Sequence, residues 1–267
     1  MAHDTFKSYK AQISKLKRFN EQISFSDLTP DFIHKYKIFL REELGNNENT
    51  TNKSLRILKV FINWAIEDEL MEKNPFSRIK TKHVDGKREF LNNYELKKLQ
   101  DLYNRGTLKT NLHNVLQYFL FSCYTGLRYT DIKELKFKSI KKRTIDDNNV
   151  DIIEIFMHKT KMPVSIPITA RARNIMPKKY SKNQYVFKVL TNQKTNQNLK
   201  EIIKIAGIDK NISFHSARHT MATTVLEMGI PIEVISKILG HTKLKTTQIY
   251  AKVNDGLKYK EMMKLDG

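Results

Sequence analysis

Two arginines, two histidines and a tyrosine in the second half of this chain are the residues best suited to chemistry. They are Arg128, His215, Arg218, His241 and Tyr250. The planar guanidinium group of arginine matches the oxygens of a phosphate and keeps its charge at any cellular pH. A tyrosine hydroxyl can accept a phosphoryl group as a covalent intermediate. This set of side chains therefore predicts an enzyme that holds a phosphate diester and attacks it.

The spacing of these residues adds to what their types indicate. His215 and Arg218 are three residues apart in His-Ser-Ala-Arg, so a helix that starts here places both on one face. A Leu-Gly-His tripeptide ends at His241, and Tyr250 follows nine residues later. Arg128 lies in Thr-Gly-Leu-Arg, just after an apolar run. Each piece alone is a weak signal, whereas the complete set in this order is a strong one.

The order Arg, His-x-x-Arg, Leu-Gly-His, Tyr resembles that of the tyrosine recombinases, the phage-integrase family. The likeness is greatest to the integrases of conjugative transposons and related mobile elements, and the matches span most of residues 90–253. Three further positions agree with the family pattern: Asp131, three residues after the first arginine; Lys159, in His-Lys-Thr-Lys before an alternating strand; and Thr247, three residues before the tyrosine.

The resemblance implies a role for each matched residue. Arg128 and Arg218 would clamp the non-bridging oxygens of a DNA phosphodiester, where negative charge builds up during attack, and His241 would add a hydrogen bond. Tyr250 would attack phosphorus, form a 3′-phosphotyrosyl link and release a 5′-hydroxyl.

Proton transfer is assigned in the same way. Lys159, matching the β-hairpin lysine of the family, is the candidate acid for the leaving 5′-oxygen, and His215 is the candidate base for the tyrosine. Asp131 would support the site without acting as a catalyst. Because the covalent link keeps the energy of the diester bond, the reaction needs neither ATP nor metal. The sequence contains no Walker loop and no acidic metal cluster, so we expect no cofactor.

The composition agrees with a polyanionic partner. The 267 residues hold 48 Lys and Arg against 28 Asp and Glu, a formal charge of +20. Residues 1–82 contribute 15 basic and 11 acidic side chains, and the remainder contributes 33 and 17, so the later part should make most phosphate contacts. Double-stranded DNA is the expected partner. A single cysteine, Cys123, in an apolar setting excludes an internal disulfide.

Helical periodicity divides the chain into two parts. Residues 1–75 read as helices and resemble the core-binding domain of the family, which makes this part a helical core-type DNA-binding domain. Asn74-Pro75 ends it, since proline disfavours helix in the residue before it. Residues 76–89 are polar and basic and are interpreted as an interdomain linker. Residues 90–267 are assigned to the catalytic domain with a C-terminal tail.

Inside the catalytic domain the period changes from helix to strand. Residues 151–156 and the alternating residues 164–168 predict two strands joined by a turn at 158–163. An earlier strand is predicted to begin near Ser139 and to turn at 146–149. The fold class is therefore mainly α with a small antiparallel β-sheet, α+β. From residue 192 the pattern returns to helix.

Candidate DNA-contacting residues lie on the third predicted helix and in the linker. The helix residues share a face opposite the apolar stripe, which a solvated surface would explain equally well. The linker residues surround Asp85-Gly86 and could cross a nucleic-acid backbone. These candidates are Lys53, Arg56, Lys59, Lys80, Lys82, Lys87 and Arg88.

Other chemistries fit the sequence less well. His215 and His219 are four residues apart, the spacing of two zinc ligands, with His241 as a third, but the glutamate of His-Glu-x-x-His is replaced by Ser216. His219 is therefore expected to be a packed or capping residue. Tyr259, a rival nucleophile, lacks the preceding Thr-x-x pattern. A type IB topoisomerase shares the tyrosine chemistry, and a degenerate recombinase could serve as a non-catalytic DNA-binding regulator.

The leading hypothesis is integration and excision of a mobile element, with a Xer-like resolvase or invertase as the alternative. The family implies a monomer in solution, a homotetramer on DNA, and accessory DNA-bending or directionality proteins as further partners. The apolar spacing of Leu257, Met262, Met263 and Leu265 suggests a tail that docks on a neighbouring subunit. With no membrane span and no secretory leader, the expected location is cytoplasmic. Many relatives carry a further N-terminal arm-binding domain, whereas this sequence starts almost directly with the core-binding helices.

Overall fold

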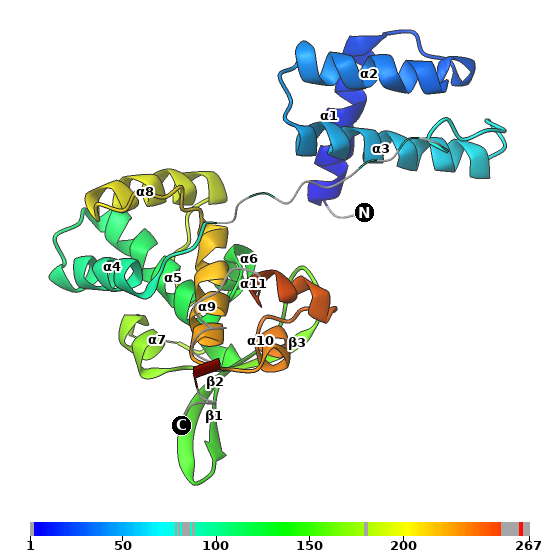
Figure 1. Ribbon diagram of the computed structural model, residues 1–267. Helices are drawn as coiled ribbons and strands as arrows, with labels where there is room; N and C mark the ends of the chain where they lie inside the picture. Colours follow the sequence, from blue (N-terminus) through cyan, green and yellow to red (C-terminus); the bar gives the residue numbers. More distant parts are fainter. Residues whose placement is uncertain are drawn as a thin grey trace. The chain divides into compact units, whose positions relative to one another are not determined.

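The computed structural model describes residues 3–77, 79, 81, 86, 89–178, 181–251 and 262–263. The chain divides into two compact units, Met1–Lys87 and Arg88–Gly267, and each is described by itself (Figure 1). Of the linker and tail residues singled out above, Lys80, Lys82, Lys87, Arg88, Leu257, Tyr259 and Leu265 lie outside the described residues. Met262 and Met263 are described and exposed.

The described residues of the first unit form three helices and one short 3₁₀ turn. They are α1 (His3–Phe19), η1 (Phe25–Asp27), α2 (Pro30–Glu42) and α3 (Glu48–Glu67). Thr29 caps α2 by accepting a hydrogen bond from the Phe32 amide, and Asn47 caps α3 in the same way. Such caps satisfy amides that the first turn of a helix leaves unpaired. The predicted start of the second helix at Thr29-Pro30 is confirmed.

The apolar stripes of these three helices meet in one small core. Ile33 and Leu40 of α2 pack against Leu55 and Ile62 of α3 within a single cluster. Phe19 of α1 lies with its ring centroid 5.1–5.3 Å from three aromatic rings of α2. The apolar residues that recur at helical spacing in the sequence therefore form the buried faces of the three helices, as this spacing predicts.

The second unit is a larger helical assembly built around one buried helix, α5 (Thr110–Thr125) (Figure 1). Helix α5 contacts α4 (Asn93–Arg105), α6 (Tyr129–Glu134), α7 (Ala170–Ile175), α8 (Asn192–Ile205) and α9 (Phe214–Glu227). It is buried nearly all round, Cys123 included. The second unit also contains η2 (Phe137–Ser139), α10 (Ile232–Ile238), η3 (Leu244–Thr246) and α11 (Gln248–Ala251).

A three-stranded antiparallel sheet in the order β1-β2-β3 completes the second unit. The strands are β1 (Ile140–Ile145), β2 (Asn148–Phe156) and β3 (Pro163–Pro167). Ile153 pairs with Ile166, and both side chains enter the main core. The β1–β2 hairpin extends away from the helices, and all of β1 after its first residue is exposed (Figure 1). The predicted fold class, mainly helical with a small antiparallel sheet, is confirmed.

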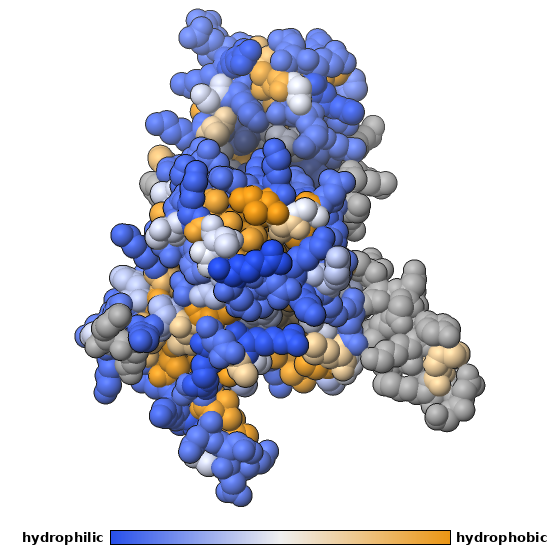
Figure 2. Space-filling view, turned by 90° about the vertical axis from the view of Figure 1, so that its left-hand side faces the viewer, coloured by the Kyte–Doolittle hydropathy of each residue, from blue (hydrophilic) through white to orange (hydrophobic). Residues whose placement is uncertain are grey.

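The surface is predominantly hydrophilic on the face in Figure 2, with small apolar areas between polar side chains. Among the described residues, no helix combines the length and the apolar character that crossing a membrane requires.

Candidate active site

Arg218 of α9 is the buried centre of the site, with only 2% of its surface exposed. Its Nη1 donates to the carbonyl of Gly126 at 2.8 Å, and its Nη2 donates to the carbonyl of Leu239. Burial lowers the pKa of Arg218 to about 10, with the charge of Arg128 adding to the shift, while a hydrogen bond with Tyr250 opposes it. The group stays charged at cellular pH. Arg218 thereby joins the turn before Arg128 to the turn before His241.

Two left-handed glycines form these turns. Gly126 ends α5 with φ 72°, and Gly240 follows α10 with φ 58°. A Cβ on Gly126 would lie 2.8 Å from Leu239 Cδ2, and a Cβ on Gly240 would lie 3.0 Å from side-chain atoms of both Met157 and Val164. The left-handed conformation therefore favours glycine at both positions, and a side chain at either would also force its neighbours to shift.

Arg128 stands at the N-terminal cap of α6, half-buried beside Arg218. Its amide donates to Asp131 Oδ2 at 3.2 Å. Within the described part of the chain, its Nη1 is buried and has no hydrogen-bond partner. Burial lowers the pKa of Arg128, and the nearby Asp131 and Tyr250 oppose that shift. A buried guanidinium nitrogen without a partner is costly to leave unpaired, so it is a natural donor for an incoming anion.

His241 lies next to the two arginines and is held by Thr247. Its Nδ1 is 2.8 Å from the Thr247 hydroxyl, and Thr247 is fully buried. Burial, together with the charges of Arg218, Arg128 and His215, lowers the pKa of His241 to about 4. The imidazole is therefore neutral at cellular pH. The sequence pattern marked Thr247 only by its spacing, and the structure places it against the histidine.

Tyr250 of α11 is buried, with 5% of its surface exposed, and hydrogen-bonds with Arg218. Its ring centroid lies 5.4 Å from that of His219, which lies 4.7 Å from that of His215. His215 is exposed, whereas His219 is buried. The expected packing role of His219 is confirmed, and its partners are the candidate nucleophile and the candidate base.

Lys159 is exposed in the turn between β2 and β3. The turn is tied to the site on both sides of the lysine. The His158 amide donates to Asp131 Oδ1 at 2.8 Å, and the Thr160 hydroxyl donates to the Gly240 carbonyl at 3.2 Å. Asp131, which is 4% exposed, thus connects the Arg128 cap with the lysine turn.

The basic residues proposed on α3 belong to the other unit. Lys53 and Arg56 are exposed, and Lys59 is half-buried. Arg56 Nε donates to the Asn52 carbonyl at 3.2 Å, which leaves its terminal nitrogens for other contacts. These side chains are accessible, as a DNA-contacting face requires.

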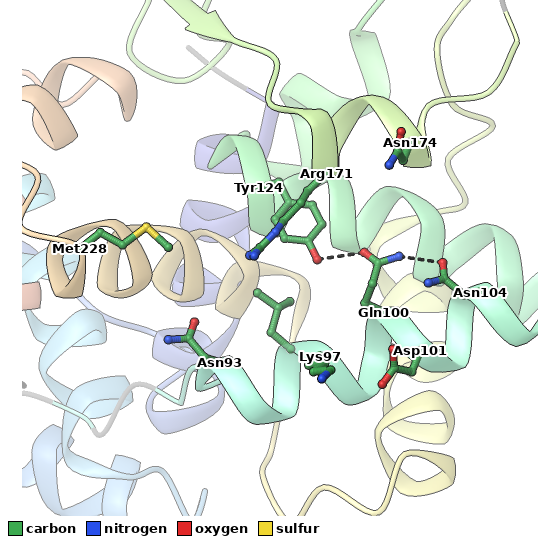
Figure 3. A pocket seen from close by; sticks show the side chains of 10 residues that line it. Asn93, Lys97, Gln100, Asp101, Asn104, Tyr124, Arg171, Asn174 and Met228 are labelled. Atoms are coloured by element: carbon green, nitrogen blue, oxygen red, sulfur yellow. Dashed lines mark hydrogen bonds between the residues drawn. The ribbon is translucent and has the colours of Figure 1, made fainter.

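A cleft of about 630 Å³ lies elsewhere in the second unit, between α4, α5, α7 and the end of α9 (Figure 3). Its walls include Gln100, which accepts a hydrogen bond from Tyr124 at 2.9 Å and donates one to Asn104 at 3.0 Å. None of the candidate catalytic residues lines it. Among the described residues, no group of three or more His, Cys, Asp or Glu could hold a metal ion.

Comparison with known families agrees with this arrangement. Residues 89–256 match the phage integrase family, and residues 1–83 match the phage integrase SAM-like domain. The chain belongs to the phage integrase family of tyrosine recombinases.

Two relatives show how similar this chain is to tyrosine recombinases in sequence. The tyrosine recombinase XerD of Listeria monocytogenes is 27% identical over 99% of this chain and 92% of its own length. A tyrosine recombinase of Thermosipho africanus is 30% identical over 82% of this chain and 76% of its own length.

Solved structures share the fold at lower identity. The Tn1549 transposon integrase in complex with a circular intermediate DNA has a TM-score of 0.76 at 16% identity, covering 99% of this chain and 94% of that one. The XerH site-specific recombinase bound to a palindromic difH substrate has a TM-score of 0.72 at 18% identity, covering 98% and 80%.

Proposed function

We propose that the protein is a site-specific DNA recombinase that cuts and rejoins duplex DNA through a 3′-phosphotyrosyl intermediate on Tyr250. The observation that carries the proposal is the pairing of Tyr250 with the buried Arg218 and the half-buried Arg128, whose Nη1 is buried and has no partner among the described residues. A tyrosine hydroxyl beside donors that match phosphate geometry is the arrangement that phosphodiester attack requires.

Charge stabilisation falls to three side chains. Arg128 offers its Nη1 to a non-bridging oxygen, and Arg218, already fixed by two carbonyls, adds its charge without reorganisation. The Thr247 hydroxyl can donate to Nδ1 of the neutral His241. In that tautomer, Nε2 of His241 carries the proton and is the ring nitrogen that would donate to the phosphate.

Protons move at the two ends of the reacting bonds. We assign Lys159 as the acid that protonates the leaving 5′-oxygen, because its turn is tied to Asp131 and Gly240 beside the site. His215 is the proposed base for Tyr250. It lies one turn before His219, whose ring contacts the tyrosine. Asp131 orients both the Arg128 cap and the lysine turn.

The partner we propose is double-stranded DNA, contacted by both units. Lys53, Arg56 and Lys59 of α3 would contact phosphates, together with Lys80, Lys82, Lys87 and Arg88 between the units. Residues 1–75 act as the core-type DNA-binding domain, 76–89 as linker and 90–267 as catalytic domain. The protein is a monomer in solution and a homotetramer on DNA, works in the cytoplasm, and can draw on accessory DNA-bending proteins.

Two biological uses of this reaction remain as candidates. Integration and excision of a mobile element is supported by the likeness to the Tn1549 transposon integrase. A Xer-like resolvase is the second candidate, supported by the similarity to XerD along nearly the whole chain.

Covalent trapping on nicked duplexes tests the proposal. A nick just beyond the cleavage point makes the fragment with the new 5′-hydroxyl short enough to diffuse away. It cannot attack the tyrosine link again, so the adduct accumulates. We expect an SDS-resistant complex in which a DNA 3′-phosphate is attached to the protein. Attachment at a 5′-phosphate would overturn the proposal. Duplexes carrying the ends of a mobile element, compared with duplexes carrying chromosomal dimer-resolution sites, distinguish the two uses.

A further inference from the structure

The β2–β3 turn has an anchor that the assigned catalytic residues do not include. The Thr160 hydroxyl donates to the carbonyl of Gly240, across 80 residues of sequence, at 3.2 Å. Thr160 directly follows Lys159, and Gly240 directly precedes His241. One hydrogen bond thus connects the candidate acid with the candidate phosphate-binding histidine.

Packing beneath the turn supports the same connection. Met157, at the base of the turn, is fully buried, and its Cγ lies 3.0 Å from where a Cβ of Gly240 would stand. The turn is closed by the Met157 amide, which donates to the Met162 carbonyl at 2.9 Å, and by the Lys161 amide, which donates to the Met157 carbonyl at 2.8 Å. The turn therefore rests on the Gly240 loop through both contact and hydrogen bond.

The side chain of Lys159 is not fixed by contacts of its own among the described residues. Among the described residues, the Lys159 side chain is exposed and has no hydrogen-bond or ion-pair partner. A lysine side chain has a flexible stem of four carbons and loses considerable conformational entropy when it is fixed. Its reach is therefore determined by the backbone of the turn, and the backbone is fixed by the bonds of His158 and Thr160 on either side.

We propose that Thr160 is a positioning residue for Lys159. By donating to the Gly240 carbonyl, it holds the turn where the Lys159 ammonium reaches the leaving 5′-oxygen at the phosphate that His241 contacts. This inference rests on the proposed function, and it adds a residue that touches neither the DNA phosphate nor Tyr250.

The step that Thr160 supports balances as follows. The Tyr250 oxygen forms a bond to phosphorus while the bond from phosphorus to the 5′-oxygen breaks. The electron pair of the broken bond stays on the 5′-oxygen, which takes a proton from the Lys159 ammonium and leaves as a 5′-hydroxyl. The tyrosine proton goes to the base. A sulfur at the bridging position leaves as a thiolate and needs no proton, so it removes the demand for Lys159.

The experiment compares single-turnover cleavage of two duplexes, one with the ordinary 5′-oxygen and one with a bridging 5′-sulfur. The variants are Thr160→Val, which keeps the shape and removes the hydroxyl, and Thr160→Ser, which keeps the hydroxyl. Lys159→Ala serves as the reference for complete loss of the acid. Thermal unfolding of each variant shows whether the fold is intact.

We expect Thr160→Val to cleave the oxygen substrate about three- to tenfold more slowly than wild type, the range set by one neutral hydrogen bond. On the sulfur substrate its rate should return to that of wild type, and Thr160→Ser should cleave both at wild-type rates. Equal slowing of Thr160→Val on both substrates overturns the inference while leaving the covalent mechanism standing. If Lys159→Ala shows no selective recovery on sulfur, the acid assignment fails and the role of Thr160 fails with it.

Discussion

At the residue scale, the two arginines of the site differ in what they do for the folded protein. Arg218 is 2% exposed and donates to two main-chain carbonyls, whereas Nη1 of Arg128 is buried without a partner in the described part of the chain. A side chain that donates hydrogen bonds to buried carbonyls contributes to the stability of the fold. A side chain whose donor is unpaired in the free protein contributes chiefly to binding the ligand.

This contrast predicts different costs for two matched substitutions. Arg218→Lys cannot reach both carbonyls with a planar fork, so we expect the free energy of unfolding to fall by about 1–3 kcal/mol. Arg128→Lys should change it by less than about 0.5 kcal/mol. Both should slow covalent cleavage by at least about 100-fold, because each removes a fixed donor to the developing charge. Urea unfolding and adduct formation measure the two effects. Equal destabilisation by both variants would refute the assignment.

A second residue-scale prediction concerns pH and His241. Its folded-state pKa is lowered from 6.5 to about 4, chiefly by burial and then by the two arginines and His215. Between these values the unfolded chain binds a proton that the folded chain excludes, so stability is lost as the pH falls from about 6.5 to about 4. The free energy of unfolding of His241→Gln, measured over the same range, should fall less steeply than that of wild type. Parallel slopes would show that His241 does not titrate in this way.

At the element scale, the active site depends on turns that end helices rather than on the helices themselves. Gly126 is the C-cap of α5, and Gly240 follows Leu239, the C-cap of α10. Both have positive φ, and their turns bring Arg128 and His241 to Arg218. At Gly240 a side chain would also meet Met157 at the base of the β2–β3 turn and Val164 of β3. The turn at Gly240 therefore carries a steric demand in addition to its backbone conformation.

A glycine with the same φ but open surroundings separates these two demands. Gly207 has φ 62°, and nothing lies within 4 Å of where its Cβ would stand. Gly207→Ala should lower the free energy of unfolding by about 1–2 kcal/mol, the cost of a left-handed alanine. Gly240→Ala should cost more, because Val164 is stiff and packed, and it should also slow cleavage. If the two substitutions cost the same in chemical denaturation, the contact at Gly240 is not restrictive.

The sequence predicts the elements well, and it predicts the connections between them poorly. The helical period located α1, α2 and α3, and the change of period located β2 and β3, because burial of one face leaves a period that can be read directly. The spacing of the candidate catalytic residues likewise predicted that Arg218, His241 and Tyr250 lie close to one another in the structure. The hydrogen bond from Thr160 to Gly240 could not be predicted from the sequence. Its acceptor is a main-chain carbonyl 80 residues away, and such a carbonyl accepts from any hydroxyl within reach. The same holds for the bond from the His158 amide to Asp131.

At the scale of the whole molecule, the charge of +20 sets how binding responds to salt. If both units contact one duplex and neutralise about 6–10 phosphates, the logarithm of the binding constant should fall with the logarithm of salt concentration by about 0.9 per phosphate. Fluorescence anisotropy with labelled duplex over a salt series measures the slope. Replacing Lys53 and Arg56 by alanine should reduce the slope by roughly 1–2. A nearly flat salt response would contradict binding by both units.

The covalent link is the central claim, and the Tyr250→Phe variant tests it most directly. This change removes the hydroxyl that hydrogen-bonds with Arg218, so the free energy of unfolding should fall by about 1–3 kcal/mol. The protein should still fold and bind duplex as wild type does, as thermal unfolding and anisotropy would show. On a nicked duplex, Tyr250→Phe should form no protein–DNA adduct, while the matched variant Tyr259→Phe should form it at the wild-type rate. Protein-linked DNA from Tyr250→Phe would contradict the account and assign the nucleophile to another residue.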